Sequence, residues 1–382
     1  MTGANGKLRD VAAVFLRLGL TAFGGPAAHV ALMENELVRR RKWLSHERFL
    51  DLLGAASLIP GPSSTELAIY LGYERAGWAG LLLGGTCFIL PAALIVGALA
   101  WAYARFGALP ALGGVLYGIK PVVIGVIVQA LWGLAPKAVK KSPLLGFVGA
   151  CACIASALGV EALAVLVGAG VLTMLARRVA RDRKGGAALM APLLSSAAAG
   201  ATAAAPVSLL GLFLTFAKLG AVVFGSGYVL LAFLRADLVD RLHWLTEPQL
   251  LDAVAVGQVT PGPVFTTATF IGYLVAGVPG AAVATVAIFL PGFLLVAATR
   301  PLVARVRRSA MAGAFLDGVN VASLGLMAVV TVQLARAAII DVPTLLIALV
   351  GTVALVRFKV SSTWLIAGAA LVGGVLRGTS AV

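Results

Sequence analysis

The chain has 382 residues, of which 60% are hydrophobic and 12% charged. A water-soluble globular domain carries about twice that share of charged residues, so this composition excludes one and indicates a polytopic membrane protein. The net charge of +15 does not indicate nucleic-acid binding, because the largest basic clusters lie between apolar segments, as they do in cytoplasmic loops near anionic lipids. These clusters are Arg39–Lys42, Lys137–Lys141, Arg177–Lys184 and Arg300–Arg308.

The chain is an internal duplication. FLRLGLTAFGG at 15–25 matches FAKLGAVVFGS at 216–226, at an offset of 201 residues. The same offset pairs Pro60-Gly61-Pro62 with Pro261-Gly262-Pro263. Further along, an offset of 200 pairs Gly72-Tyr73 with Gly272-Tyr273. Two repeats of one architecture therefore form the chain.

The predicted domains are an N-terminal repeat over 1–179, an Ala-, Gly- and Ser-rich connector over 180–207, and a C-terminal repeat over 208–382. Each repeat contains six apolar segments of helical length. They lie at 11–31, 50–72, 78–104, 110–135, 143–158 and 160–176, and at 209–233, 249–273, 278–299, 311–336, 338–356 and 361–377.

The charge pattern predicts the topology. If the second segment of each repeat is re-entrant and the other five cross the membrane, most basic clusters fall on the cytoplasmic side, as the positive-inside rule requires. Five is an odd number, so the second repeat starts inverted. We therefore predict an all-α polytopic fold with an inverted-topology repeat, about ten spanning helices and two broken re-entrant segments.

Proline and glycine interrupt the second segment of each repeat. Proline cannot continue a helix, and the pieces 50–60 and 62–72 would each reach only about 16 Å. Pro62 suits the first position of the second piece, which leaves the amides of Ser63, Ser64 and Thr65 without partners inside the helix. Such an end binds anions.

The second repeat offers a matching end, and matched discontinuous helices favour a transporter site over the alternative, a structural kink. The candidate substrate-binding residues here are Pro60, Gly61, Pro62, Ser63, Ser64 and Thr65 in the first repeat and Thr260, Gly262 and Thr266 in the second.

A basic residue inside a membrane-spanning segment costs free energy of insertion, so it usually has a function. Lys120 has Asn320 as its counterpart, and both are candidates for substrate binding. Arg17 and Lys218 are further candidates for substrate binding. They occupy matching positions seven residues before Gly24 and Gly225, so each base is expected to share a helix face with a glycine cluster. The alternative for Arg17 and Lys218 is snorkelling to the headgroups.

The glycine clusters Gly24-Gly25-Pro26 and Gly225-Ser226-Gly227 could unwind the first helix of each repeat or permit close backbone approach, with close packing alone as the alternative. The candidate substrate-binding residues in them are Gly24, Gly25, Gly225, Ser226 and Gly227. Glu66 is the proton-coupling candidate, with a favourable helix-dipole contact as the alternative. His29 has no metal-site spacing and no evident acidic partner. No cofactor or metal is expected, and Glu34 and Glu36 are expected to pair with the neighbouring arginines.

The combined motifs resemble the chromate ion transporter family in its long, two-domain form. They are FLRLGLTAFGGPAAH, the segment from ENELVRRRKWLSH to LIPGPSSTELAIYLGY, and GIKPVV in the first repeat, with FAKLGAVVFGSGYVLL and VTPGPVFTTATFIGY in the second. The resemblance implies a bacterial or archaeal inner-membrane protein that exports chromate on the electrochemical gradient and confers chromate resistance. The family motifs fall on Gly24-Gly25-Pro26, Pro60-Gly61-Pro62 and Lys120-Pro121.

Rival interpretations remain open at this stage. One is a carrier of sulfate or a related oxyanion with the same site. The others are a membrane enzyme with Ser63 or Ser64 as nucleophile, which lacks an evident base, and a scaffold protein, which leaves the duplicated broken helices unexplained. The expected partners are chromate, sulfate as the alternative, protons as a candidate coupling ion, the lipid bilayer and, as one option, a second copy in a homodimer.

Overall fold

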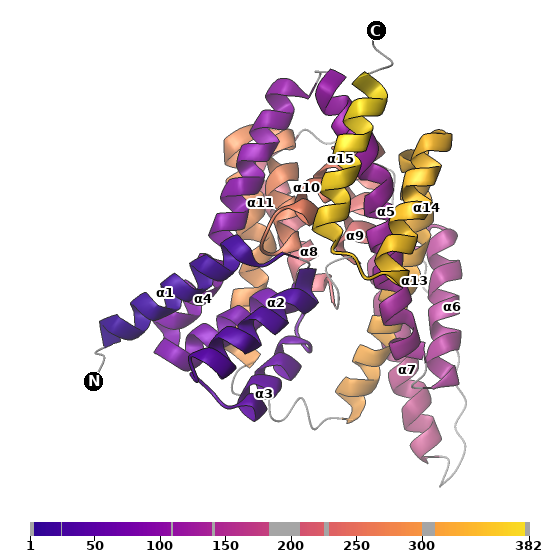
Figure 1. Ribbon diagram of the computed structural model, residues 1–382. Helices are drawn as coiled ribbons and strands as arrows, with labels where there is room; N and C mark the ends of the chain where they lie inside the picture. Colours follow the sequence, from indigo (N-terminus) through magenta and orange to yellow (C-terminus); the bar gives the residue numbers. More distant parts are fainter. Residues whose placement is uncertain are drawn as a thin grey trace.

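The computed structural model describes residues 4–23, 25–107, 110–139, 142–182, 207–224, 229–299 and 310–378. Within these ranges the secondary structure is helical, with no β-strand (Figure 1). The first half contains α1 (Ala4–Thr21), α2 (Gly25–Met33), the π-helix η1 (Glu34–Arg40), α3 (His46–Ala56), α4 (Ser63–Phe106), α5 (Pro110–Val139), α6 (Pro143–Ala157) and α7 (Ala162–Asp182). The second contains α8 (Leu209–Val222), α9 (Leu230–Leu234), η3 (Arg235–Arg241), α10 (Glu247–Val259), η4 (Val264–Thr266), α11 (Thr267–Thr299), α13 (Ala310–Ala338), α14 (Val342–Arg357) and α15 (Ser362–Gly378).

The two halves repeat each other down to their irregular backbone. Each carries a seven-residue π-helix, η1 or η3, at the same place. The residue two positions beyond each π-helix has a left-handed backbone, with φ 50° at Lys42 and 52° at His243. The predicted duplication is confirmed.

A sharp reversal divides α4 into two antiparallel arms. It lies at Ala76-Gly77, where Gly77 has φ 64°, and the matching Ala276-Gly277 reverses α11 in the same way. The arms touch through backbone, because a Cβ built on Gly72 would lie only 2.2 Å from the carbonyl oxygen of Gly80. The glycines near the turn therefore permit the close approach of the two arms.

The helix α3 and the first arm of α4 run antiparallel and meet at Pro60-Gly61-Pro62. An ion pair joins Arg48, near the start of α3, to Glu74, near the end of that arm. With eleven residues α3 reaches only about 16 Å, too short to span a bilayer. This arrangement is the geometry expected of the re-entrant segment.

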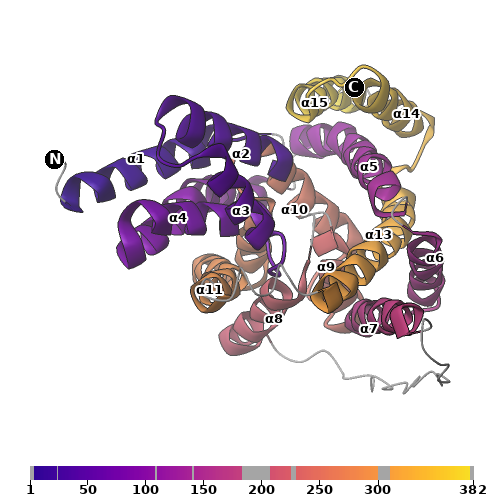
Figure 2. The same cartoon turned by 90° about the horizontal axis from the view of Figure 1, so that it is seen from below.

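The halves interlock through their C-terminal helices. α5 packs against α14 and α15, while its counterpart α13 packs against α6 and α7 (Figure 2). The contacts are close and reciprocal: a Cβ on Gly118 would meet the carbonyl oxygen of Ala369, and one on Gly318 that of Ala169. Each half therefore completes the helix packing of the other.

Five helices in the described part of the chain are long and apolar enough to cross a membrane, namely α4, α5, α7, α11 with η4, and α13. The helices α6, α8, α14 and α15 are apolar but shorter. The predicted count of ten spans stays a prediction. The first apolar segment of each half is not one continuous helix. In the first half α1 ends at Thr21 and α2 begins at Gly25, and in the second α8 ends at Val222 and α9 begins at Leu230.

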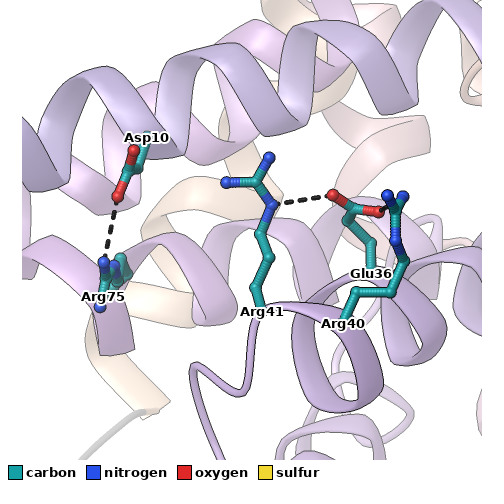
Figure 3. Close-up of polar contacts among 5 residues, drawn as sticks. All are labelled: Asp10, Glu36, Arg40, Arg41 and Arg75. Atoms are coloured by element: carbon teal, nitrogen blue, oxygen red, sulfur yellow. Dashed lines mark hydrogen bonds and ion pairs between the residues drawn. The ribbon is translucent and has the colours of Figure 1, made fainter.

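The predicted pairing of Glu34 and Glu36 with the arginine run is confirmed. Glu36 accepts hydrogen bonds from Arg40 at 2.7 Å and Arg41 at 2.8 Å (Figure 3). The hydrogen bond from Arg41 lowers the pKa of the Glu36 carboxyl group below its ordinary value. Nearby, Arg75 at the reversal of α4 donates to Asp10 of α1 at 3.1 Å, which ties the two helices together.

Candidate functional site

The two Pro-Gly-Pro tips meet the interrupted first helices of the opposite halves. Gly61 N–H donates to the carbonyl oxygen of Val223, which follows α8, at 2.7 Å. Reciprocally, Gly262 N–H donates to the carbonyl oxygen of Ala22, which follows α1, at 2.9 Å. Both tips therefore lie where the two halves touch. Their glycines have positive φ, 126° at Gly61 and 90° at Gly262, which favours this residue type.

Two backbone amides at the start of α4 lack hydrogen-bond partners in the described structure. Pro62 precedes the helix as its cap, so the prediction that Pro62 is the first helical residue is wrong by one position. Its carbonyl oxygen accepts from Thr65 N–H at 2.6 Å, which also removes Thr65 from the predicted free amides. Within the described residues, the amides of Ser63 and Ser64 have no hydrogen-bond partner.

Polar side chains without partners surround the same helix end. Thr65 and Glu66 are each 1% exposed. Neither the Thr65 hydroxyl nor either Glu66 carboxyl oxygen has a hydrogen-bond partner in the described structure. The Glu66 side chain lies back over Gly61 and also against Gly292 of α11, as the positions of Cβ atoms built on these glycines show. Buried polar groups are normally paired, so these atoms make the start of α4 a candidate site for a polar ligand.

His29 of α2 belongs to this site, although the sequence interpretation set it aside. It is 1% exposed, and its ring nitrogens lie at hydrogen-bond distance from two groups at the interface. Nδ1 is 3.2 Å from the Ser64 hydroxyl oxygen, and Nε2 is 3.1 Å from the carbonyl oxygen of Ala22. The available signal was a histidine in an apolar segment just after the helix-breaking Gly24-Gly25-Pro26.

The matching end in the second half has no free hydroxyl donor of this kind. Thr260 donates to the carbonyl of Val256 at 3.0 Å, and Thr266 donates to that of Pro263 at 2.7 Å. Phe265, which stands 201 positions after Ser64, is fully buried. The two ends are matched in backbone but not in chemistry.

Lys120 is engaged in an ion pair between the halves. Its Nζ lies 3.0 Å from Oδ1 of Asp252 on α10, a residue that is almost fully buried. Tyr103 donates to the other carboxylate oxygen at 2.9 Å. Asn320, the counterpart of Lys120, is exposed on α13.

Arg17 and Lys218 are not brought to the tips. Arg17 is exposed on α1, and this helix ends before Gly24, so the predicted shared face is wrong. Lys218 lies 3.0 Å from Asp237 and 3.8 Å from Glu161. Gly25 has φ 78°, consistent with an unwound break. Gly24, Gly225, Ser226 and Gly227 lie outside the described residues.

Comparison with known proteins agrees with this architecture. The family model for chromate transporters matches the chain twice, over residues 9–174 and 210–374. The chain belongs to the chromate transporter family. The sequence-based resemblance to that family is therefore confirmed, and the two matched stretches are the two halves of the fold.

Curated relatives are similar over most of their length. A chromate transport protein from Cupriavidus metallidurans is 40% identical over 372 residues, covering 96% of this chain and 92% of the relative. A probable chromate transport protein from Synechococcus elongatus is 38% identical and covers 91% and 89%. A chromate transport protein from Pseudomonas aeruginosa is 33% identical and covers 87% and 82%. No solved structure matches the chain.

Proposed function

We propose that this protein is a secondary active transporter that exports chromate across the inner membrane and confers chromate resistance. The observation that supports this proposal most directly is the start of α4. There, two free backbone amides and the unpartnered Thr65 hydroxyl provide buried hydrogen-bond donors. A helix N-terminus carries roughly half a positive charge, which suits an anion. The names of the curated relatives supply chromate as the substrate.

The proposed ligand sits against Ser63, Ser64 and Thr65. A tetrahedral dianion accepts hydrogen bonds from several directions, which suits the amides and hydroxyls gathered at this helix end. The carboxyl group of Glu66 lies over Gly61, next to the same helix end. An anion and a carboxylate repel each other, so Glu66 favours anion binding when it carries a proton, as a proton-coupling group does.

Lys120 is the proposed counter-charge. Asp252 already neutralises it, so the incoming dianion would compete with that carboxylate for the ammonium group. We propose no role in anion binding for Arg17, Lys218 or Asn320. Arg17 and Asn320 are exposed, and Lys218 pairs with Asp237.

The proposed transport cycle is alternating access by rocking of two inverted halves, 1–179 and 208–382, with about ten spanning helices between them. The hydrogen bonds from Gly61 to Val223 and from Gly262 to Ala22 link the halves at the site. Rocking would break and remake such contacts around a fixed site, as in other transporters built from inverted repeats.

Chromate flux into proteoliposomes tests this function. Flux is measured with an imposed pH gradient and, separately, with sulfate trapped on the opposite side. Flux on the pH gradient alone indicates proton coupling, whereas flux only against sulfate indicates exchange. Because sulfate has the same charge and shape, competition by sulfate would support the alternative of a broader oxyanion carrier. Absence of flux in both assays, with folded protein, would contradict the proposed function.

A further inference from the structure

The hydrogen bonds of His29 fix which ring nitrogen carries the proton. A carbonyl oxygen only accepts hydrogen bonds, so Nε2, 3.1 Å from the carbonyl of Ala22, must carry a hydrogen. In the neutral imidazole the other nitrogen, Nδ1, is then an acceptor. The Ser64 hydroxyl, 3.2 Å away, must donate to it. Neutral His29 therefore occupies the only hydrogen that the Ser64 hydroxyl can donate.

Protonation reverses this hydrogen bond. In the imidazolium both nitrogens are donors, so Nδ1–H donates to the Ser64 oxygen while Nε2–H still donates to Ala22. The Ser64 hydroxyl hydrogen is then free to turn toward a ligand at the start of α4. The imidazolium also adds a positive charge behind that hydroxyl, in a buried site where electrostatic attraction is strong.

We propose that His29 is a positioning residue that links proton uptake to oxyanion binding, by reversing its hydrogen bond with Ser64. The inference rests on the proposed function, since it assigns the regulation of that same site. His29 is a separate group, on α2 rather than α4: Glu66 carries its proton before the anion arrives, whereas His29 takes up one proton together with one anion.

Three elements pack against His29, and their polar and titratable groups are as follows. From α4, the Ser64 hydroxyl and the Phe88 ring, edge-on at 5.6 Å, contact His29, and Glu66 is the titratable group at the same helix end. From η1, Glu34 and Glu36 are held by arginines on the exposed side. From α1, Asp10 pairs with Arg75. Glu66 is therefore the main rival as the group that takes up the proton.

The second half has no counterpart of the hydrogen-bonded pair His29 and Ser64. At an offset of 201 residues, Leu230 stands where His29 stands and Phe265 where Ser64 stands. Both are buried and apolar. The reversal of this hydrogen bond is therefore confined to the first half, and this route binds one proton with each oxyanion.

The test measures chromate affinity against pH on the purified full-length protein, above neutral pH where chromate stays a dianion. Uptake of one proton on binding weakens the apparent affinity about tenfold for each unit rise in pH. His29→Gln is designed to mimic the neutral histidine, because a glutamine side chain has an amide that can donate to Ala22 and an oxygen that can accept from Ser64, and it does not titrate. We expect weak and pH-independent binding in this variant.

Three comparisons decide the outcome. His46→Gln, an exposed histidine outside the site, should keep the wild-type slope. A pH-indicator dye should report about one proton taken up per chromate bound by the wild type, a readout that needs no variant. Glu66→Gln should keep the slope. Loss of the slope in Glu66→Gln and its retention in His29→Gln would assign the proton to Glu66 and overturn the inference.

Two results separate this inference from the proposed function. Tight but pH-independent chromate binding by the wild type would overturn the role of His29 and leave the transporter standing. Failure of folded wild-type protein to bind chromate at any pH would overturn both.

Discussion

Lys120 of α5 and Asp252 of α10 form an ion pair across the two halves, with Nζ 3.0 Å from Oδ1. Tyr103 of α4 donates to the second carboxylate oxygen at 2.9 Å. Asp252 is 3% exposed, so its charge depends on these two partners. A lysine that sequence reasoning assigns to the substrate is therefore occupied by a protein carboxylate in this structure.

The pair predicts a specific pattern of rescue. Lys120→Met leaves the buried Asp252 carboxylate without its cation, which typically costs about 3–5 kcal/mol of folding stability. Adding Asp252→Asn removes the stranded charge, so the double variant should regain most of the lost thermal stability. We expect neither variant to transport chromate, because both lack the ammonium group.

Thermal unfolding and chromate flux of the two variants check this prediction together. If the double variant is stable and transports at the wild-type rate, Lys120 has only a structural role and its part in anion binding is wrong.

The antiparallel arms of α4 predict a strong effect of very small substitutions. Gly72→Ala would place a methyl group 2.2 Å from the carbonyl oxygen of Gly80, and backbone cannot move aside cheaply. We expect a loss of about 1–3 kcal/mol in the free energy of unfolding, as for other overpacked cores. Gly133→Ala in α5 is the matched control, because its added Cβ has no neighbour within 4 Å in the described structure beyond the adjacent residues and backbone of its own helix. Equal thermal stability of the two variants would contradict the close packing of the arms.

The contacts of Glu36 predict a pH-dependent stability. Arg41 lowers the pKa of this carboxyl group in the folded protein. Its contribution is therefore present above the unfolded-state pKa of about 4 and is lost as pH falls through the folded-state value. The difference in unfolding temperature between the wild type and Glu36→Gln should be largest at neutral pH and shrink on acidification. A difference that stays constant down to acid pH would show that the ion pairs do not stabilise the fold.

Much of the fold follows from local sequence signals. Apolar segments separated by basic or glycine-rich turns predict the helices. The matched Pro60-Gly61-Pro62 and Pro261-Gly262-Pro263 predict the positions of both tips. Such signals are readable because a proline or a basic cluster acts on the chain where it stands. The interlocking of α5 with α15 and α13 with α7 was not predicted, because packing partners far apart in sequence leave no local pattern.

The site was harder to predict for the same reason. The amides and hydroxyls after Pro62 were found because helix ends have a sequence signature. The partners of the basic residues were missed: Asp252 lies far from Lys120 in sequence, and Asp237 meets Lys218 only after the chain turns back. His29 has no metal-site spacing and no acidic partner in the sequence, and only the fold brings the Ser64 hydroxyl to it.

The central claim is that the oxyanion binds at the start of α4 in the first half and not at its counterpart in the second. Chromate flux into proteoliposomes, compared between Thr65→Val and Thr266→Val, tests this claim most directly. A hydrogen bond to a charged ligand contributes about 1.5–3 kcal/mol, so Thr65→Val should weaken apparent chromate affinity by roughly 10- to 100-fold. Thr266 already donates to Pro263, so Thr266→Val should bind chromate almost as the wild type does. Equal affinity in Thr65→Val and wild type, with a loss in Thr266→Val, would contradict the account.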